Sequence, residues 1–321
     1  MNNYTWLQKK LHKLALSSNF IREMMFDIDL LISNNQSCND KHVFVSGLAR
    51  SGTTILLNAL FQSKQFASLS YEDMPFVLAP NLWSKISISS KHEGAVERAH
   101  GDGIKVATNS PEAFEEVFWM TFEDDQNDVI ENFKLYVASI VGKYNKNRYL
   151  SKNNQNIRRL ELINNIFPNS LILVPFRNPI QHTYSLLIQH KKFISESVDD
   201  SFISEYMSWI GHTEFGPNYK PITPSGLQFP DDLELNHWLE QWHLTYANLG
   251  HISKRIDQLY FVCYESLCSS NVTWEKISKL ANLPYSRFEF HESKKIIDAE
   301  IDPEMLKKCN DIYNDMRKNS I

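Results

Sequence analysis

The chain has no long hydrophobic run and few cysteines. A membrane-spanning helix needs about eighteen consecutive apolar residues, and no stretch of the sequence is that long. The first residues, Met1 to Trp6, lack the apolar centre of a signal peptide. The four cysteines form no C-x-x-C pair, and their spacing indicates neither a zinc site nor a disulfide framework. We therefore expect a soluble, cytoplasmic protein with reduced thiols.

The chain also lacks an excess of positive charge. The chain has 33 Lys and Arg against 38 Asp and Glu, a formal net charge of -5, which argues against a protein that coats nucleic acid. Cations that bind an anionic ligand must then be concentrated at particular motifs. Hydrophobic residues make up 42% of the 321 residues, enough for a full core. No repeat or composition break compels a second domain, so we expect a single domain over residues 1–321.

Two of only 10 glycines mark the most informative segment, His42 to Leu57. An apolar, strand-like run leads into a turn that contains Gly47 and Gly52, and a helical pattern follows. The backbone amides of residues 51–54 are therefore expected to open a helix and to bind an anion. This pattern predicts a phosphate-binding loop, although glycine-containing strand-to-helix turns also occur as simple tight connections.

The loop differs from that of nucleoside-triphosphate kinases at one position. Its glycine spacing matches G-x-x-x-x-G-K-[ST], but Thr53 stands where the lysine belongs, and the cation of the loop is Arg50. Amides, hydroxyls and one guanidinium can bind a nucleotide with a simple 5′-phosphate beside a transferable anionic group. We expect no magnesium or other metal at this site.

A second strand-turn-helix pattern lies at residues 171–188. The apolar run of residues 171–176 ends in Arg177, and Pro179 suits the first turn of the helix that follows. Ser185 lies almost two helical turns beyond Pro179, so Arg177 and Ser185 can converge on a second anion. The alternative is an arginine that caps a helix and a serine on a polar helix face.

Together the two segments resemble the sulfotransferase family, which uses 3′-phosphoadenosine 5′-phosphosulfate as donor. The resemblance implies that residues 47–54 bind the 5′-phosphosulfate, and that Arg177 and Ser185, at the family's eight-residue separation, bind the 3′-phosphate. It extends to residues 70–73, 150–153 and 260–265 and so covers roughly residues 40–270. Because its loop carries an arginine, the chain resembles the tyrosylprotein and carbohydrate branches of the family more than the cytosolic small-molecule branch. Within those branches it looks most similar to the bacterial members.

The resemblance also implies the catalytic residues. Glu72 matches the family's general base in Tyr71-Glu72-Asp73, with Asp73 as the adjacent competitor. His92 or His100 would be the base if the site works like the histidine-dependent cytosolic branch. Without the resemblance, Glu72 is simply a carboxylate near a loop.

The remaining implied residues bind the donor. Lys152 matches a lysine that reaches the sulfonate or the bridging oxygen, and Arg50 would hold the 5′-phosphate and stabilise the departing charge. Tyr264 occupies the position of a donor-contacting tyrosine, although a buried core tyrosine explains it almost as well. Amides and hydroxyls in the loop come from Ser51, Gly52, Thr53 and Thr54.

We therefore expect sulfuryl transfer from this donor, by in-line displacement, to a hydroxyl or amine of an unidentified small-molecule, carbohydrate or peptide acceptor, with adenosine 3′,5′-bisphosphate as the product. The alternatives are a divergent P-loop kinase, which needs a magnesium-holding aspartate at the end of a strand, and an inactive sulfotransferase-fold binding protein.

The predicted fold class is α/β, a P-loop-type three-layer fold with a central parallel sheet flanked by helices. We expect an N-terminal helical hairpin over residues 1–35, a catalytic core over 40–270 and a C-terminal helical or lid segment over 271–321. Predicted helices cover residues 111–120, 128–144, 157–167 and 233–255. Predicted strands cover residues 148–151, 171–176 and 259–263, and Glu72 is expected at the end of a further short strand. Residues 215–230 are expected to form a long loop.

The first helical pattern is basic and amphipathic. Lys9, Lys10 and Lys13 alternate with leucines, so weak contact with a membrane surface is one interpretation, and packing against the domain or a partner subunit is the other. A homodimer is compatible with the second interpretation, and we expect no nucleic-acid partner.

Overall fold

The structure is a computed structural model that describes residues 5–33, 39–87, 96–97, 105–106, 110–123, 128–199, 201–222, 233–297 and 299–321. Its α-helices are α1 (Trp6–Leu16), α2 (Asn19–Ile32), α3 (Thr53–Phe61), α4 (Pro80–Ile86), α5 (Glu116–Phe122), α6 (Val129–Lys143), α7 (Leu160–Ile166), α8 (Pro179–Asp199), α9 (Ser201–Trp209), α10 (Leu235–Ile252), α11 (Tyr264–Ser269), α12 (Asn271–Leu280) and α13 (Pro303–Asn319). The strands are β1 (Val43–Val45), β2 (Val96–Glu97), β3 (Lys105–Val106), β4 (Leu150–Lys152), β5 (Leu171–Phe176) and β6 (Leu259–Cys263), and two 3-10 helices are η1 (Tyr71–Asp73) and η2 (Asn154–Arg158).

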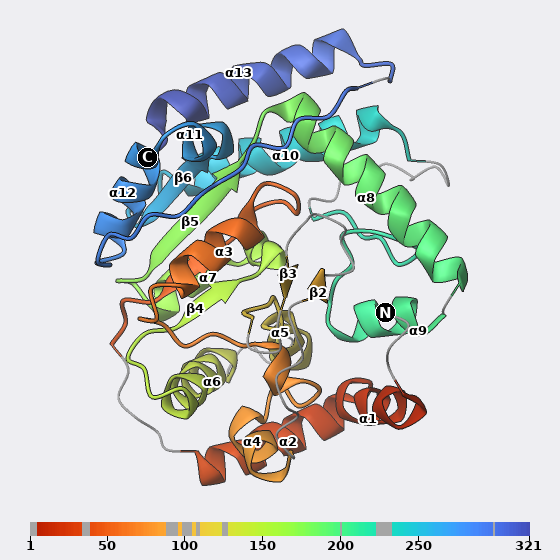
Figure 1. Ribbon diagram of the computed structural model, residues 1–321, viewed down its shortest axis with the longest axis vertical. Helices are drawn as coiled ribbons and strands as arrows, with labels where there is room; N and C mark the ends of the chain where they lie inside the picture. The colour runs from red at the N-terminus through yellow and green to blue at the C-terminus, as the bar shows by residue number, and fades with distance from the viewer. Residues whose placement is uncertain are drawn as a thin grey trace.

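A four-stranded parallel sheet lies at the centre, in the order β4-β1-β5-β6, and helices flank it (Figure 1). This confirms the predicted α/β class. Strands β2 and β3 pair separately and antiparallel. Because the four central strands are parallel, their carboxyl ends meet at one edge, where ligands bind in open α/β sheets.

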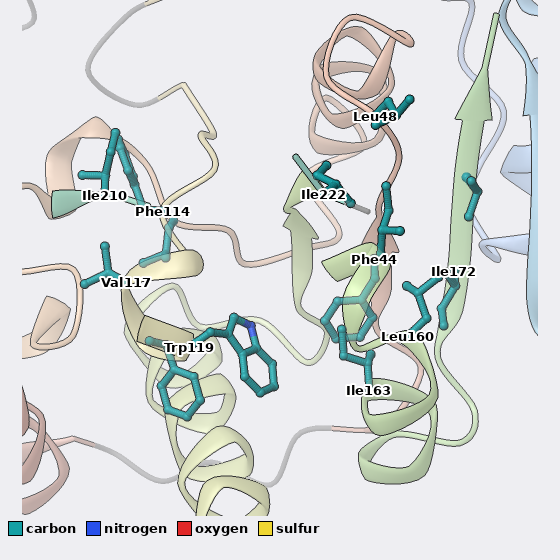
Figure 2. Close-up of a cluster of buried hydrophobic side chains, with 14 of the residues drawn as sticks. Phe44, Leu48, Phe114, Val117, Trp119, Leu160, Ile163, Ile172, Ile210 and Ile222 are labelled. Carbon is teal, nitrogen blue, oxygen red and sulfur yellow. The ribbon is translucent and has the colours of Figure 1, made fainter. Parts of the chain in front are cut away.

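The two faces of the sheet are covered by different helices. Val43 and Val45 pack in a cluster with residues of α3 and α12, whereas Phe44 packs in the cluster on the other face. In Figure 2, Phe44 lies beside Leu160 and Ile163 of α7. Successive strand side chains point to opposite faces, so a one-residue slip of β1 would exchange both clusters. The register of β1, and with it the start of the following loop, is therefore well specified.

The N-terminal helices pack at the end of the molecule opposite α13 (Figure 1). Asp29 of α2 is buried and accepts hydrogen bonds from Ser139 Oγ (2.7 Å), Asn81 Nδ2 (2.9 Å) and the Leu82 amide (2.8 Å), which join α2 to α4 and α6. The outward face of α1 leaves Trp6 and Leu7 about 70% exposed. Within the described residues, no helix has the length and apolar character needed to cross a membrane.

The C-terminal part of the chain returns along the sheet before it ends in α13. Residues 283–302 have no regular secondary structure where they are described, and α13 packs on α10 and α8 (Figure 1). Asp302 caps α13 by accepting hydrogen bonds from the amides of Glu304 (2.9 Å) and Met305 (3.3 Å). The irregular stretch therefore connects β6 and its helices back to α8.

Three local predictions were wrong. The helix expected from Pro111 begins only at Glu116, because residues 110–112 instead pair with the segment at Ser70. The segment that carries Glu72 is a 3-10 turn rather than a strand, and Ser70 caps it. The helix expected over residues 157–167 is divided into η2 and α7, since the Asn153 side chain accepts from the Gln155 amide (3.0 Å) and starts the tighter turn.

Candidate functional site

The carboxyl ends of all four parallel strands surround one cavity of about 280 Å³. Lys152 ends β4, the glycine loop follows β1, Arg177 follows β5, and Tyr264 follows β6. Seven of the ten predicted site residues line this cavity: Arg50, Gly52, Thr53, Thr54, Lys152, Arg177 and Tyr264. The structure thus brings together side chains that are far apart in the sequence.

The loop after β1 requires both of its glycines. A Cβ atom on Gly47 would lie 2.9 Å from the Pro175 carbonyl oxygen, and one on Gly52 would lie 2.8 Å from Cδ2 of Tyr264. Gly52 has a φ of 102° and Arg50 a φ of 69°, both in the left-handed region. Helix α3 begins directly after Gly52, so its first amides point toward the cavity that Thr53 and Thr54 line.

A buried histidine of α8 contacts the backbone of this loop. His182 of α8 is fully buried, and its Nε2 lies 2.7 Å from the Ala49 carbonyl oxygen. Burial lowers the pKa of His182 to about 3, so the ring stays neutral and Nε2–H donates to that carbonyl. The residue before Arg50 is therefore fixed by α8. Sequence reasoning missed His182; the apolar periodicity of the helix was the one indication that position 182 faces inward.

The predicted second anion site contacts the first one. Arg50 Nε donates to Ser185 Oγ at 3.2 Å, and Ser185 is buried beside the cavity without lining it. The Arg177 guanidinium lies 5.0 Å from the ring centroid of Tyr264, a cation–π contact, and donates to the Ser293 carbonyl. The two strand-turn-helix units therefore form one continuous surface.

Tyr264 connects this surface to the C-terminal segment. Its ring packs against Gly52, and its hydroxyl donates to the His291 carbonyl at 2.7 Å. Burial raises the pKa of Tyr264 to about 12, so the phenol remains a hydrogen-bond donor. His291 and Ser293 line the cavity as well. These two residues lie in the C-terminal segment that was expected to be helical or a lid, and neither was among the predicted site residues.

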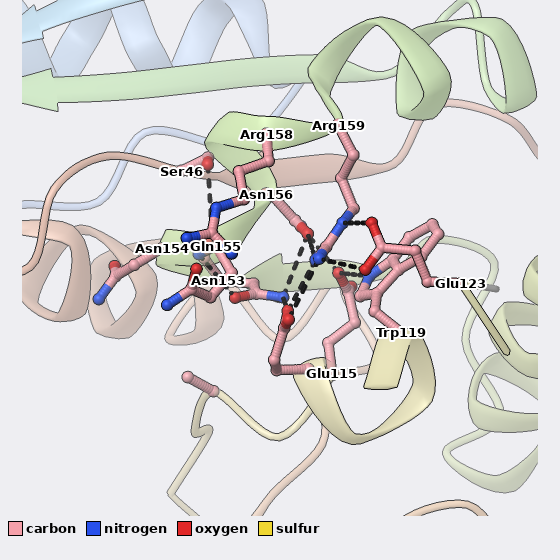
Figure 3. A network of polar contacts seen from close by, with 12 residues as sticks. Ser46, Glu115, Trp119, Glu123, Asn153, Asn154, Gln155, Asn156, Arg158 and Arg159 are labelled. Atoms are coloured by element: carbon pink, nitrogen blue, oxygen red, sulfur yellow. Dashed lines mark hydrogen bonds and ion pairs between the residues drawn. The ribbon is translucent and has the colours of Figure 1, made fainter. Parts of the chain in front are cut away.

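A buried polar network holds the residues that follow Lys152 (Figure 3). Asn153 Nδ2 donates to Glu116 Oε2 at 2.8 Å, and Asn156 Nδ2 donates to Glu115 Oε1 at 2.7 Å. Arg159 forms a bidentate pair with Glu116, at 2.7 and 3.1 Å. Burial is the main cause that raises the pKa of Glu116, and the paired guanidinium opposes it. The backbone that follows Lys152 is therefore anchored by two carboxylates at the start of α5, those of Glu115 and Glu116.

The predicted base does not lie among these groups. Glu72 is exposed on η1 and is not one of the described residues that line the cavity, so its role stays a prediction. Asp73 is fully buried and structural: it pairs with Lys143 and accepts from Tyr144 Oη (2.7 Å) and the Ser70 amide (2.7 Å). His92 and His100 lie outside the described residues.

The cavity carries a positive balance in a chain whose net charge is negative. Arg50, Lys152 and Arg177 line it, and Glu214 is the one carboxylate among its described lining residues. The described part of the chain holds no cluster of three or more His, Cys, Asp or Glu side chains suited to a metal ion. An anionic ligand fits this charge distribution.

A comparison with known protein families matches residues 42–214 to the sulfotransferase family, which is more than half of the chain. The chain belongs to the sulfotransferase family. The matched region of this sulfotransferase includes the glycine loop, Lys152, Arg177 and Ser185, whereas Tyr264 follows it. No curated protein sequence matches the chain.

Three solved bacterial structures are similar to this sulfotransferase. Sulfotransferase STF1 from Mycobacterium tuberculosis is 13% identical, with a TM-score of 0.46, and the match covers 95% of this chain and 81% of that one. Sulfotransferase STF9 from Mycobacterium avium is 12% identical, with a TM-score of 0.47, and the match covers 98% of this chain and 79% of that one. A sulfotransferase from Alicyclobacillus acidocaldarius is 12% identical, with a TM-score of 0.42, and the match covers 87% of this chain and 93% of that one.

Proposed function

We propose that this sulfotransferase moves a sulfuryl group from 3′-phosphoadenosine 5′-phosphosulfate to a nucleophile on an acceptor. The observation that carries the proposal is that Arg50 and Arg177, from two separate strand-turn-helix units, line one cavity. A donor with phosphate groups at both the 3′ and the 5′ position of its ribose needs two cationic sites on one surface. The Arg50–Ser185 hydrogen bond of 3.2 Å supports placing the two sites side by side.

Each residue has a distinct part in this proposal. The first amides of α3, the hydroxyls of Thr53 and Thr54 and the Arg50 guanidinium bind the 5′-phosphosulfate. Ser51, which was also predicted to bind it, is fully buried and does not line the cavity. Lys152 stabilises the charge that develops on the bridging oxygen as the bond to sulfur breaks, which lowers the barrier of an in-line displacement.

The other end of the donor is assigned to the second unit. Arg177 and Ser185 bind the 3′-phosphate, and Tyr264 contacts the nucleotide between the two ends. The 3′-phosphate is the group that separates this donor from ordinary adenosine nucleotides. No metal ion is needed, since the developing charge is balanced by side chains.

Competitive binding tests the donor assignment. We expect adenosine 3′,5′-bisphosphate to bind about 10- to 100-fold more tightly than ATP in calorimetric titrations, because a charge-assisted hydrogen bond contributes about 1.5–3 kcal/mol. Arg177→Met should remove most of that preference. Arg287→Met, an exposed arginine paired with Glu289, is the matched control and should leave it intact.

Two results would contradict the proposal. Equal affinity for the bisphosphate and ATP would remove the assignment of Arg177 and Ser185 to a 3′-phosphate. Magnesium-dependent phosphate transfer from ATP would favour a divergent kinase, although β5 and β6 lead to Arg177 and Tyr264 rather than to the aspartate a kinase needs. Bisphosphate binding without transfer to any acceptor would indicate an inactive binding protein.

A further inference from the structure

The far end of the cavity is built by a segment to which neither the family resemblance nor the donor proposal gives a role. Phe193 of α8, Met207 of α9 and Phe215 form an apolar wall of the cavity. The rings of Phe193 and Phe215 stack, with centroids 6.1 Å apart and an interplanar angle of 23°. Phe193 lies eight residues beyond Ser185, which is about 12 Å along α8 at 1.5 Å per residue. The wall is therefore well separated from the arginine end.

The turn that leaves α9 places two polar residues beside this wall. Gly211 has a φ of 73°, and the His212 amide donates to the Met207 carbonyl at 2.9 Å, the pattern of a glycine-terminated helix. His212 Nε2 lies 3.2 Å from the Ala113 carbonyl oxygen, which fixes the ring. Glu214 follows two residues later, half-buried, with its side chain at the cavity.

Glu214 is linked to Thr53, the first residue of α3 after the glycine loop, through one amide side chain. Asn154 Nδ2 donates to Glu214 Oε1 at 3.1 Å, and Asn154 Oδ1 accepts from Thr53 Oγ1 at 3.4 Å. Asn154 also stands two residues after Lys152, which lines the same cavity. The carboxylate thus lies between the cationic end and the apolar wall, where the nucleophile of an acceptor must meet the sulfuryl group.

We propose that Glu214 is the general base, and that the wall of Phe193, Met207 and Phe215 binds the apolar body of a phenol or alcohol acceptor. Glu214 takes the hydroxyl proton as the acceptor oxygen bonds to sulfur. The bond from sulfur to the bridging oxygen breaks, and its electron pair stays on the 5′-phosphate. The products are the sulfate ester, adenosine 3′,5′-bisphosphate and a protonated Glu214. This inference rests on the proposed function.

Glu214 competes with Glu72 for the same role. The sequence pattern favours Glu72, but that residue is exposed on η1 and outside the cavity lining, whereas Glu214 lines the cavity with Arg50 and Lys152. A base must reach the proton that it removes in the bound geometry. Location therefore favours Glu214, and Glu72→Gln belongs in the same experiment.

The test uses the full chain, donor labelled with radioactive sulfur, and two acceptor probes: 2-naphthol and methyl N-acetylglucosaminide. We expect transfer to 2-naphthol at least 10-fold faster than to the sugar. Glu214→Gln should lower kcat by about 100- to 10,000-fold, the usual contribution of a general base, and leave the affinity for adenosine 3′,5′-bisphosphate within threefold. Glu205→Gln on α9, whose side chain is 50% exposed, is the matched control with unchanged kcat.

The outcomes separate the two proposals. If the bisphosphate binds with its expected preference but Glu214→Gln keeps near-normal kcat, or Glu72→Gln alone loses it, then Glu214 is not the base. Faster transfer to the sugar than to 2-naphthol, or no transfer to 2-naphthol, would overturn the acceptor assignment. A loss of bisphosphate preference in the unaltered protein would instead contradict the donor proposal. Phe215→Ala should raise KM for 2-naphthol while Kd for the bisphosphate stays unchanged.

Discussion

At the residue scale, Gly52 shows how closely the backbone and a side chain approach each other at the anion loop. Its positive φ disfavours any residue with a Cβ, and the Tyr264 ring occupies the space where that atom would be. Gly52→Ala must therefore shift the loop or the ring. We expect the affinity for adenosine 3′,5′-bisphosphate to fall at least 10-fold, measured by calorimetry.

Gly250→Ala is the matched control for this prediction. Gly250 lies within α10, where an added Cβ meets no atom within 4 Å. Alanine is the better helix former, so this variant should bind normally and be stabilised by about 0.5–1 kcal/mol. If both variants bind equally well, the contact between the loop and Tyr264 has no part in binding.

Residue by residue, the sequence predicted the cationic side of the cavity better than its other walls. Arg50, Lys152 and Arg177 stand in or directly after strands, and parallel strands bring such positions together. Glu214 and His291 have no comparable pattern, because each follows an irregular turn whose path depends on packing. Glu72 illustrates the opposite case, in which a matching local pattern lies outside the cavity.

At the element scale, Glu116 of α5 and Arg159, the residue between η2 and α7, form an ion pair that is almost completely buried. Arg159→Met removes the guanidinium that pairs with Glu116, whose side chain is only 9% exposed. An unpaired buried carboxylate destabilises a protein by about 3–5 kcal/mol. We expect a loss of that order in the free energy of unfolding, measured by urea denaturation, and a lower kcat because residues after Lys152 lose their anchor.

Arg255→Met tests whether burial causes this effect. Arg255 pairs with Glu161 at 2.6 Å, but the two side chains are 57% and 55% exposed. An exposed pair contributes about 0–1 kcal/mol, so the control should change stability little. A similar loss of stability in both variants would show that the buried ion pair stabilises the fold no more than an exposed one does.

Elements whose character is decided by short-range patterns were predicted most accurately. Strand β5 spans the predicted residues 171–176, since its apolar run is bounded by polar residues on both sides. The start of α5 was missed because residues 110–112 pair with a segment about forty positions away, and no local pattern reveals such a partner. Much of the expected loop over residues 215–230 lies outside the described residues.

At the scale of the whole molecule, buried neutral histidines make stability depend on pH. His42 Nδ1 accepts from the Tyr149 amide at 2.9 Å, and burial, aided by the charge of Arg148, lowers the pKa of His42 to about 4. For His182 the value is about 3. Both values lie below the ordinary 6.5, so below pH 6.5 the unfolded chain binds protons that the folded chain does not.

The free energy of unfolding should therefore fall as pH falls from 7 to 5, by about 2 kcal/mol for each of these two histidines. Urea denaturation at several pH values measures this change. His42→Gln keeps an acceptor for the Tyr149 amide and should remove the part of this pH dependence that His42 causes. A free energy of unfolding that is constant between pH 7 and 5 would contradict the assignment of neutral, buried rings.

The domain division, the contact of α1 with a membrane surface and the homodimer stay predictions at this scale. The exposed Trp6 and Leu7 of α1 are compatible with either kind of contact. The described helices exclude neither, because an exposed apolar face does not identify what covers it.

The position of the Tyr264 ring has an energetic consequence for the whole of the proposed nucleotide site. Because one ring touches Gly52 and stacks on Arg177, displacement of either loop changes the surroundings of the other. In the proposed donor complex, we therefore expect the binding free energies of the 3′ and 5′ phosphate groups to be coupled and not additive. We expect a nucleotide that lacks one phosphate to lose that contact and, in addition, part of the affinity that its remaining phosphate contributes.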